Sequence, residues 1–327
     1  MKPHLFGFTL LSLVAIVASA PAHAQNGTLT RSFVSSTGVD SNPCTITQPC
    51  ATFAQAYTKI GANGIIAALD PGKYGPITIA GGVTINGNGW SAITAPIYGT
   101  GITINAGSDN VTLTGLEIDG AGDGYDGIVV NSAGNLTITN CVLKDFASGP
   151  NNIAAGIWMQ PTSGTFIFTI TNTTVSNVTY AGIFYQPPNG SAYTTGVIDH
   201  VVVNKSFNGI FVDPVNASSS TTYIAISNSI VSNNSQNGIN ITAGSALVRL
   251  TIDNVSITDN VLPSGSGAGL FIRGTPTVSI SRSVITNNYL GIDNGTVNTL
   301  YTYGNNQINL NNQDSVGSAL NTLYKPE

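Results

Sequence analysis

The chain has 327 residues and a formal net charge of −5, and only 8% of its residues are charged. A typical soluble domain has about a quarter, and no cluster of Lys and Arg offers the phosphate contacts of a nucleic-acid-binding surface. Intrinsic disorder is also excluded, because short segments rich in β-branched residues recur between runs of Gly, Asn, Ser and Thr.

The first residues have the layout of a secretory leader. Lys2 precedes an apolar run, and the small residues Ala22 and Ala24 mark a cleavage site. We therefore assign residues 1–24 to a signal peptide and expect the mature chain to start at Gln25. Because no later segment is long and apolar enough to span a bilayer, we expect a secreted or periplasmic protein.

The next segment, residues 25–90, is expected to form an N-terminal cap and the first coils. The positions of Phe53, Tyr57 and Ile60 predict a short amphipathic helix with one apolar face. An apolar strand follows at residues 65–69. Such a cap would shield the first coil from pairing edge to edge with another chain.

The cap segment also contains two of the three cysteines. Cys44 and Cys50 flank a short loop, and in an oxidising compartment we expect a disulfide between them. Zinc would need two more thiolates or imidazoles nearby, which this segment lacks. Cys141 lies in an apolar run and is expected to be a small buried side chain and not a nucleophile.

Residues 91–310 carry an internal repeat, which is the strongest pattern in the sequence. A Gly followed by Ile or Leu recurs at intervals of 22 to 31 residues, with a mean of about 27. The apolar members of these pairs are Ile102, Ile128, Ile157, Ile183, Ile210, Ile239, Leu270 and Ile292. A second register holds alternating apolar and polar residues, as in 136–140 and 250–254, which is the period of a half-buried strand.

A repeat built only from short strands cannot bury its own apolar side and must stack on its neighbours, with strands about 4.8 Å apart. The predicted fold is therefore all-β, a right-handed parallel β-helix, or solenoid, with a short N-terminal helix cap. Right-handedness follows from the chirality of parallel crossovers. Leucine-rich repeats need helices or dense Leu, and propeller blades are longer and antiparallel, so both fit less well. After Gly291 the repeat decays, and residues 311–327 are expected to form a C-terminal tail.

In such a stack, each repeated position becomes a column of side chains. The column of apolar residues must point inward. A column of Asn should occupy a tight turn, because Asn tolerates the left-handed conformation and its amide can bond to the Asn above and below. Its expected members are Asn140, Asn172, Asn228, Asn254 and Asn305.

Two segments resemble a known superfamily. Residues Phe33 to Pro43, together with Leu69-Asp70-Pro71-Gly72-Lys73-Tyr74, resemble the N-terminal part of secreted bacterial members of the right-handed β-helix superfamily typified by pectate lyases. The likeness covers essentially the whole mature chain. It implies the fold and an extracellular polysaccharide as partner. The superfamily holds lyases, hydrolases, epimerases and proteins without a known reaction, so the activity stays open.

The catalytic segments of that superfamily are not found. The Asn-Thr-Asp, Gly-His-Gly and Arg-Ile-Lys segments of polygalacturonase-like enzymes have no counterpart here. Val197-Ile198-Asp199-His200 is similar to the Trp-Ile-Asp-His segment of pectate lyases, but the Trp is replaced and no Arg-x-Pro-x-x-Arg segment follows. Because His200 falls in the Asn column, we expect it to be a turn residue. The alternative is a catalytic group.

Further catalytic candidates are isolated from one another. Asp199 and Asp253 share a column two coils apart, which places them about 10 Å from each other and makes them a marginal inverting pair. Asp213 is the lone carboxylate on its face, and Arg273 is a candidate base on a different coil. We therefore identify no complete catalytic constellation.

One outward column is rich in aromatic residues. It contains Trp158, Phe184, Phe211 and Phe271, and a polar column with Gln160 and Gln186 runs beside it. Sugar rings stack on aromatic faces and their hydroxyls bond to amides, so these six residues are candidates for carbohydrate binding. Two alternatives remain open at this point. The long connections between coils could cover the stripe, or it could form a dimer interface.

The densest acidic segment runs from Glu117 to Asp126. Asp119, Asp123 and Asp126 on a Gly-rich loop could hold Ca²⁺, although the spacing lacks an EF-hand pattern and a solvated loop is the other interpretation. No other cofactor is indicated.

Three functions are compatible with these patterns. The first is a secreted polysaccharide-binding β-helix protein without a catalytic constellation. The second is a lyase or glycosidase acting on an acidic polysaccharide, and the third is a structural cell-surface or matrix protein. The sequence gives no indication of the oligomeric state.

Overall fold

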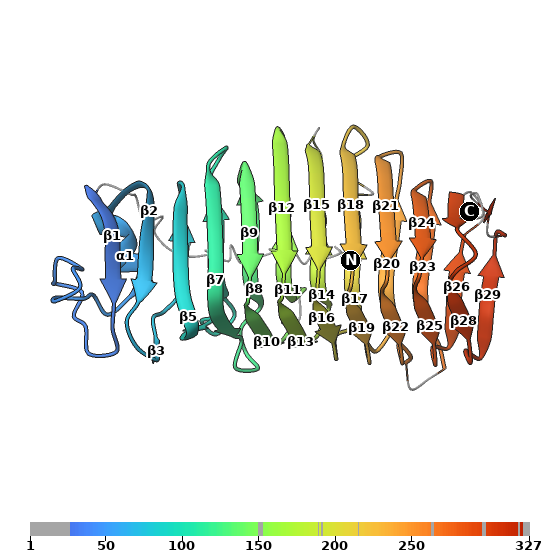
Figure 1. The fold of residues 1–327 in the computed structure, drawn as a ribbon, viewed down its shortest axis with the longest axis horizontal. Coiled ribbons are helices and arrows are strands. Elements are labelled where there is room, and N and C mark those ends of the chain that lie inside the picture. The colour runs from blue at the N-terminus through green and yellow to red at the C-terminus, as the bar shows by residue number, and fades with distance from the viewer. Residues whose placement is uncertain are drawn as a thin grey trace, which may run out of the picture.

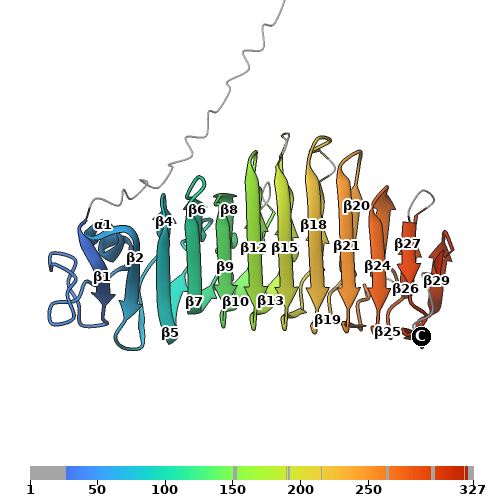
Figure 2. The ribbon, with the colours of Figure 1, turned by 45° about the horizontal axis from the view of Figure 1, so that its top comes forward.

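The computed structural model describes residues 27–149, 153–188, 190, 192–214, 216–262, 265–295, 299–319 and 321–322. The predicted signal peptide, residues 1–24, lies outside the described residues. The chain winds into an elongated stack of coils, from blue at one end to red at the other in Figure 1. Neighbouring coils pair through parallel strands, as β11 does with β14 and β17 with β20. The same order of coils is visible after a 45° turn (Figure 2).

Most coils contribute one strand to each of three faces. Face 1 consists of β7 (Asn110–Asp119), β9 (Asn135–Thr139), β12 (Thr165–Thr171), β15 (Tyr193–Asp199), β18 (Thr221–Ser227), β21 (Leu247–Asp253), β24 (Thr277–Ser281), β27 (Thr299–Thr302) and β30 (Asn321–Thr322). Face 2 consists of the shorter strands β10 (Val142–Phe146), β13 (Thr174–Val178), β16 (Val202–Asn204), β19 (Ile230–Ser232), β22 (Ser256–Thr258), β25 (Val284–Thr286) and β28 (Gln307–Asn309).

Face 3 is a separate sheet of ten strands. They are β4 (Ile77–Ile79), β6 (Thr100–Asn105), β8 (Asp126–Ser132), β11 (Ala155–Met159), β14 (Ala181–Tyr185), β17 (Asn208–Val212), β20 (Asn237–Ala243), β23 (Ala268–Gly274), β26 (Leu290–Asn294) and β29 (Gln313–Gly317). The stack therefore reaches into both terminal segments, since β4 pairs with β6 and β29 pairs with β26.

The predicted apolar column is confirmed by the strand register of face 3. Ile128 pairs with Ile157, Ile157 with Ile183, and this sequence of pairs continues to Ile292. All members of the column are at most 1% exposed. Burying each Ile contributes about 1.5–3 kcal/mol, so the column is a main source of cohesion between coils.

The Gly before each of these Ile residues lies where the backbone passes close to the core of an adjacent face. A Cβ atom at Gly182 would lie 2.3 Å from Val203 Cγ1 and 2.9 Å from the carbonyl oxygen of Gly209. No larger side chain fits without a shift of the backbone. This steric limit explains why Gly recurs with the repeat.

Faces 1 and 2 meet at a one-residue corner in the left-handed conformation. The φ angles are +54°, +47°, +47° and +55° at Asn140, Asn172, Asn228 and Asn254. The expected left-handed turn is thus confirmed at these four residues. The expected amide bond between coils is shown for one pair, since Asn254 Nδ2 donates a hydrogen bond of 2.8 Å to Asn228 Oδ1. The fifth expected member is displaced by one residue, because Gly304 takes the corner with φ +74° and Asn305 follows it.

Faces 2 and 3 meet at a second corner that the sequence analysis did not identify. Its left-handed residues are Asp145, Asn177, Lys205, Asn233, Asp259, Asn287 and Leu310. In several coils the next residue is an inward-pointing Asn. The buried amides of Asn234, Asn260 and Asn288 form a ladder that ends at the partly buried Asn311. The repeated pairs Asn233-Asn234 and Asn287-Asn288 are the signal that could have revealed this corner.

The N-terminal cap consists of β1 (Leu29–Val34), α1 (Phe53–Lys59), β2 (Ile60–Ala68), β3 (Gly72–Lys73) and β5 (Val83–Thr94). The predicted helix is confirmed, except that Ile60 begins β2. Thr52 caps α1 by accepting a hydrogen bond from the Gln55 amide at 3.1 Å. Cys44 and Cys50 form the predicted disulfide, and Cys141 is free and buried. Among the described residues, no helix is long and apolar enough to cross a membrane.

Candidate functional site

The aromatic stripe on face 3 has the predicted register but is largely covered. Trp158 pairs with Phe184 and Phe184 with Phe211, with ring centroids 5.8 and 5.1 Å apart. Phe184 is 0% and Phe211 8% exposed, and Tyr180 packs edge-on against Phe184 at 5.4 Å. Of the alternatives left open by the sequence, this burial favours the covered stripe. Glycan contact at these rings stays a prediction, and the burial of the rings argues against it.

In the polar column beside the stripe, side chains form hydrogen bonds from one coil to the next. Gln160 Nε2 donates to Asn131 Oδ1 at 2.8 Å, and Gln186 Nε2 donates to Asp213 Oδ2 at 2.9 Å. Asp213 is itself buried. Arg273, two coils further on and thus about 10 Å away along the stack, is not brought together with Asp213.

Arg273 forms a contact of its own at the end of this column. Its two terminal nitrogens donate to the carboxylate of Asp293 at 2.9 and 2.8 Å. Its guanidinium carbon lies 3.9 Å from the ring centroid of the partly exposed Phe271. The ion pair and the ring contact together hold Arg273 along the surface, where it links β23 to β26.

The acidic loop does not gather its carboxylates into one centre. Asp119 accepts a hydrogen bond from the Ala121 amide at 2.7 Å and lies 3.7 Å from Lys144 Nζ. Asp126 is buried in β8, and this burial raises the pKa of its carboxyl to about 7 although the Ala155 amide donates to it. Asp123 is exposed. No group of three or more His, Cys, Asp or Glu that could hold a metal ion occurs in the described part of the chain.

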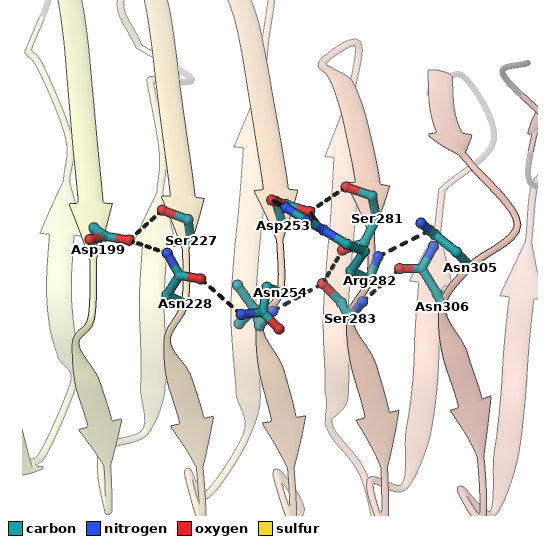
Figure 3. Close-up of polar contacts among 11 residues, drawn as sticks. Asp199, Ser227, Asn228, Asp253, Asn254, Ser281, Arg282, Ser283, Asn305 and Asn306 are labelled. Atoms are coloured by element: carbon teal, nitrogen blue, oxygen red, sulfur yellow. Dashed lines mark hydrogen bonds and ion pairs between the residues drawn. The ribbon is translucent and has the colours of Figure 1, made fainter. Parts of the chain in front are cut away.

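The corner between faces 1 and 2 carries a charged network between β15 and β27 (Figure 3). Asp199 accepts hydrogen bonds from Ser227 Oγ at 2.6 Å and Asn228 Nδ2 at 2.8 Å, and His200 Nδ1 lies 2.6 Å from its other oxygen. Partial burial raises the pKa of Asp199, but the hydrogen bonds from these partners outweigh it and hold the pKa below its usual range.

The second carboxylate of this network is bound in the same way. Asp253 accepts hydrogen bonds from Arg282 and from Ser281 Oγ, the latter at 2.7 Å. The contact with Arg282 lowers the pKa of Asp253 further than burial raises it. His200 and Arg282 both have positive φ, +51° and +49°, at the corner where other coils have Asn. The interpretation of His200 as a turn residue is thus supported by its backbone.

An open trough runs across the outer side of face 1, and we name it the Tyr223 trough. Its first hollow, of about 430 Å³, is lined by Ile167, Phe168, Thr169, Thr195, Gly196, Val197, Tyr223, Ile224, Ala225, Arg249 and Thr251. A second hollow continues from Thr251 past Asp253 to Tyr303, and a third shares Arg282 with the second and reaches His200. The shared residues make the three hollows one surface over neighbouring coils.

The first hollow has an apolar floor with aromatic and hydroxyl groups. Arg249 lies over the ring of Tyr223 at 5.7 Å, and the Tyr193 ring lies 5.9 Å from that of Tyr223. Ile167 and Val197 are 42% and 41% exposed beside them. The sequence analysis missed Tyr193, Tyr223 and Arg249. The signal that could have revealed them lies in the outward-facing positions of the alternating strands, if the side chains at these positions are compared from one coil to the next.

Parallel coils with three faces, an inward Ile column and left-handed corners define the class of this protein. It is a right-handed parallel β-helix protein, and residues 100–261 match the family model described as "Right handed beta helix region". The resemblance to right-handed β-helix proteins is thereby confirmed.

Comparison with solved structures adds one similar fold. The crystal structure of pectate lyase Pel9A aligns with a TM-score of 0.48 and 16% sequence identity, over 90% of this chain and 76% of that chain. No curated protein matches the chain.

Proposed function

We propose that this chain is a polysaccharide-binding β-helix protein and that it holds the glycan in the Tyr223 trough. The observation that carries the proposal is the group of Tyr193, Tyr223 and Arg249 on the outer side of face 1, in which Tyr193 and Arg249 are exposed and Tyr223 is partly exposed. Aromatic rings stack on the C–H faces of sugars, and the Thr hydroxyls beside them can bond to sugar hydroxyls. The trough is open to solvent, whereas Phe184 of the aromatic stripe is not.

The proposed location is outside the cytoplasm, in the periplasm or beyond the cell. The disulfide between Cys44 and Cys50 fits an oxidising compartment. The leader-like residues 1–24 support the same location. A polysaccharide partner is most accessible there.

Replacing Tyr223 by Ala tests the binding site. We expect the variant to bind glycan at least about tenfold more weakly, because a ring contact and the apolar area that it buries are together worth about 1.5 kcal/mol or more. The measurement is calorimetric titration of the purified protein with a panel of polysaccharide fragments, chosen first for binding to the wild type. Tyr98→Ala is the matched control, since Tyr98 is 66% exposed and lies on the connection between β5 and β6. Equal loss in both variants, or none in Tyr223→Ala, would refute the assignment.

One observation favours an enzyme as the second candidate function. The Asp199 carboxylate lies against the His200 imidazole at the edge of the trough, and a carboxylate that orients an imidazole is a pattern of general bases. Asp199 and Asp253 are both held in hydrogen bonds to their neighbours, which supports binding without cleavage.

The two candidates differ in what the protein does to a bound glycan. We expect neither unsaturated products in the ultraviolet nor new reducing ends after prolonged incubation with glycans that bind. Product that forms with the wild type and disappears in His200→Gln would instead assign a lyase or glycosidase activity to this pair.

A further inference from the structure

We infer that the polysaccharide held in the Tyr223 trough is a neutral glycan that lies across the strands, parallel to the long axis of the stack. This inference rests on the proposed function and names its substrate class. It contradicts the sequence-based alternative of an acidic polysaccharide. Three observations support it, namely the direction of the trough, the charges along it and the groups that line it.

The direction follows from how the hollows join. The first hollow is lined by β12, β15, β18 and β21, and the second continues from Thr251 over β24 to Tyr303. The trough therefore crosses strands rather than following one. At about 4.8 Å per strand, the five steps from β12 to β27 span roughly 24 Å. A linear polymer is the ligand whose shape fits such a surface.

The charges along the trough do not repeat as a polyanion would require. Its two outward columns are Ile167, Thr195, Tyr223, Arg249, Thr277 and Thr169, Val197, Ala225, Thr251, Ser279. They hold a single charged residue, Arg249, which has no ion-pair partner among the residues that the structure describes. A polymer with a carboxylate on every sugar needs cations at similar intervals, and these two columns offer one. Arg282, which lines the second and third hollows, is paired with Asp253.

The column next to these two is acidic. Asp199 and Asp253 occupy it on β15 and β21, and the hydrogen bonds that lower their pKa keep both ionised at neutral pH. Arg282 is paired with Asp253, and His200 Nδ1 lies against the Asp199 carboxylate, so neither group adds unpaired positive charge at this edge. With a net charge of −5 for the whole chain, a polyuronate approaching the trough would be repelled.

The lining suits uncharged sugar rings. Tyr223 lines the trough, the exposed Tyr193 ring lies beside it at 5.9 Å, and Arg249 extends the flat surface over Tyr223. Ile167 and Val197 add exposed aliphatic area on the neighbouring strands. Apolar and aromatic groups with interspersed hydroxyls match the alternating C–H faces and hydroxyls of a neutral glycan.

The test compares neutral and acidic oligosaccharides of matched length by calorimetric titration of the mature protein at low salt, where electrostatic effects are largest. The neutral set is glucan, galactan and mannan fragments, and the acidic set is oligogalacturonate and alginate fragments. We expect at least one neutral glycan to bind about tenfold or more tightly than any acidic one. Its affinity should rise with oligomer length and level off once the oligomer spans roughly 24 Å.

Two variants separate the contributions of shape and charge. Arg249→Gln removes the cation and should weaken the binding of acidic glycans by a larger factor than that of the neutral glycan, whereas Tyr223→Ala should weaken the neutral glycan by about tenfold or more. Asp199→Asn keeps an acceptor for Ser227 and Asn228 and should increase the affinity for oligogalacturonate.

The outcomes distinguish the inference from the function on which it rests. Tighter binding of an acidic glycan that Arg249→Gln abolishes would overturn the neutral assignment and leave polysaccharide binding intact. If the affinity no longer rises with oligomer length beyond two sugars, the proposed placement of the glycan along the stack is overturned. Failure of every glycan to bind would refute both proposals together.

Discussion

Asp126 is a strongly perturbed carboxyl on face 3. Its side chain is buried at the start of β8 and receives one hydrogen bond, from the Ala155 amide at 2.9 Å. Removal from water disfavours the ionised form more than this bond favours it. Burial therefore raises its pKa to about 7, from the ordinary value of 3.8.

The raised pKa of Asp126 predicts that the free energy of unfolding falls as the pH rises between about 4 and 7. In this window the unfolded chain releases the proton while the folded carboxyl retains it. Each rise of one pH unit therefore lowers the free energy of unfolding by up to about 1.4 kcal/mol. Asp126→Asn should remove this dependence and stabilise the protein at pH 7.5. Urea unfolding at pH 5 and 7.5 measures the effect, with the exposed Asp123→Asn as control. An unchanged pH slope in Asp126→Asn would contradict the assignment.

At the scale of elements, the two corners use asparagine for different purposes. In the first corner the backbone needs the left-handed conformation, and the exposed amides of Asn228 and Asn254 add one bond between coils. In the second, the amide of Asn260 is buried and satisfies two backbone groups of the preceding coil, the Asn234 amide and the Val231 carbonyl. The second corner is therefore the more costly one to disrupt.

Replacing Asn260 by Ala should destabilise the protein by about 3 kcal/mol or more. The change leaves the Asn234 amide and the Val231 carbonyl without the bonds that Asn260 makes to them, and each unsatisfied buried group costs about 1–3 kcal/mol. The measurement is chemical denaturation. Asn135→Ala is the matched control, because its ladder bond to Asn110 is exposed, and it should cost less than about 1 kcal/mol. Equal effects of the two substitutions would argue against the buried ladder.

The strand columns were predictable because they depend only on the period of the sequence. Ile128, Ile157 and Ile183 share a position in the repeat and therefore share a column. The covering of Phe184 was not predictable, since it depends on where Tyr180 packs and how the long connections return. The trough was missed for another reason: Ile167, Tyr223 and Arg249 share a column but no residue type.

At the scale of the whole molecule, the fold presents two long outer surfaces with different properties. On face 3, Trp158, Phe184 and Phe211 pack together and the polar column is bonded from coil to coil. On face 1, the long strands lie side by side (Figure 1). The side chains of Tyr193 and Arg249 are exposed on this face. The account therefore places ligand contact on face 1 and a purely structural role on the aromatic stripe.

Hydroxyl-radical footprinting of the protein, with and without saturating neutral glycan, tests this placement most directly. We predict that the glycan protects Tyr193 and Tyr223 from oxidation and leaves Tyr98 and Trp158 unchanged. Protection of Trp158 or Phe271 with no change at Tyr193 and Tyr223 would contradict the account and return the binding site to face 3.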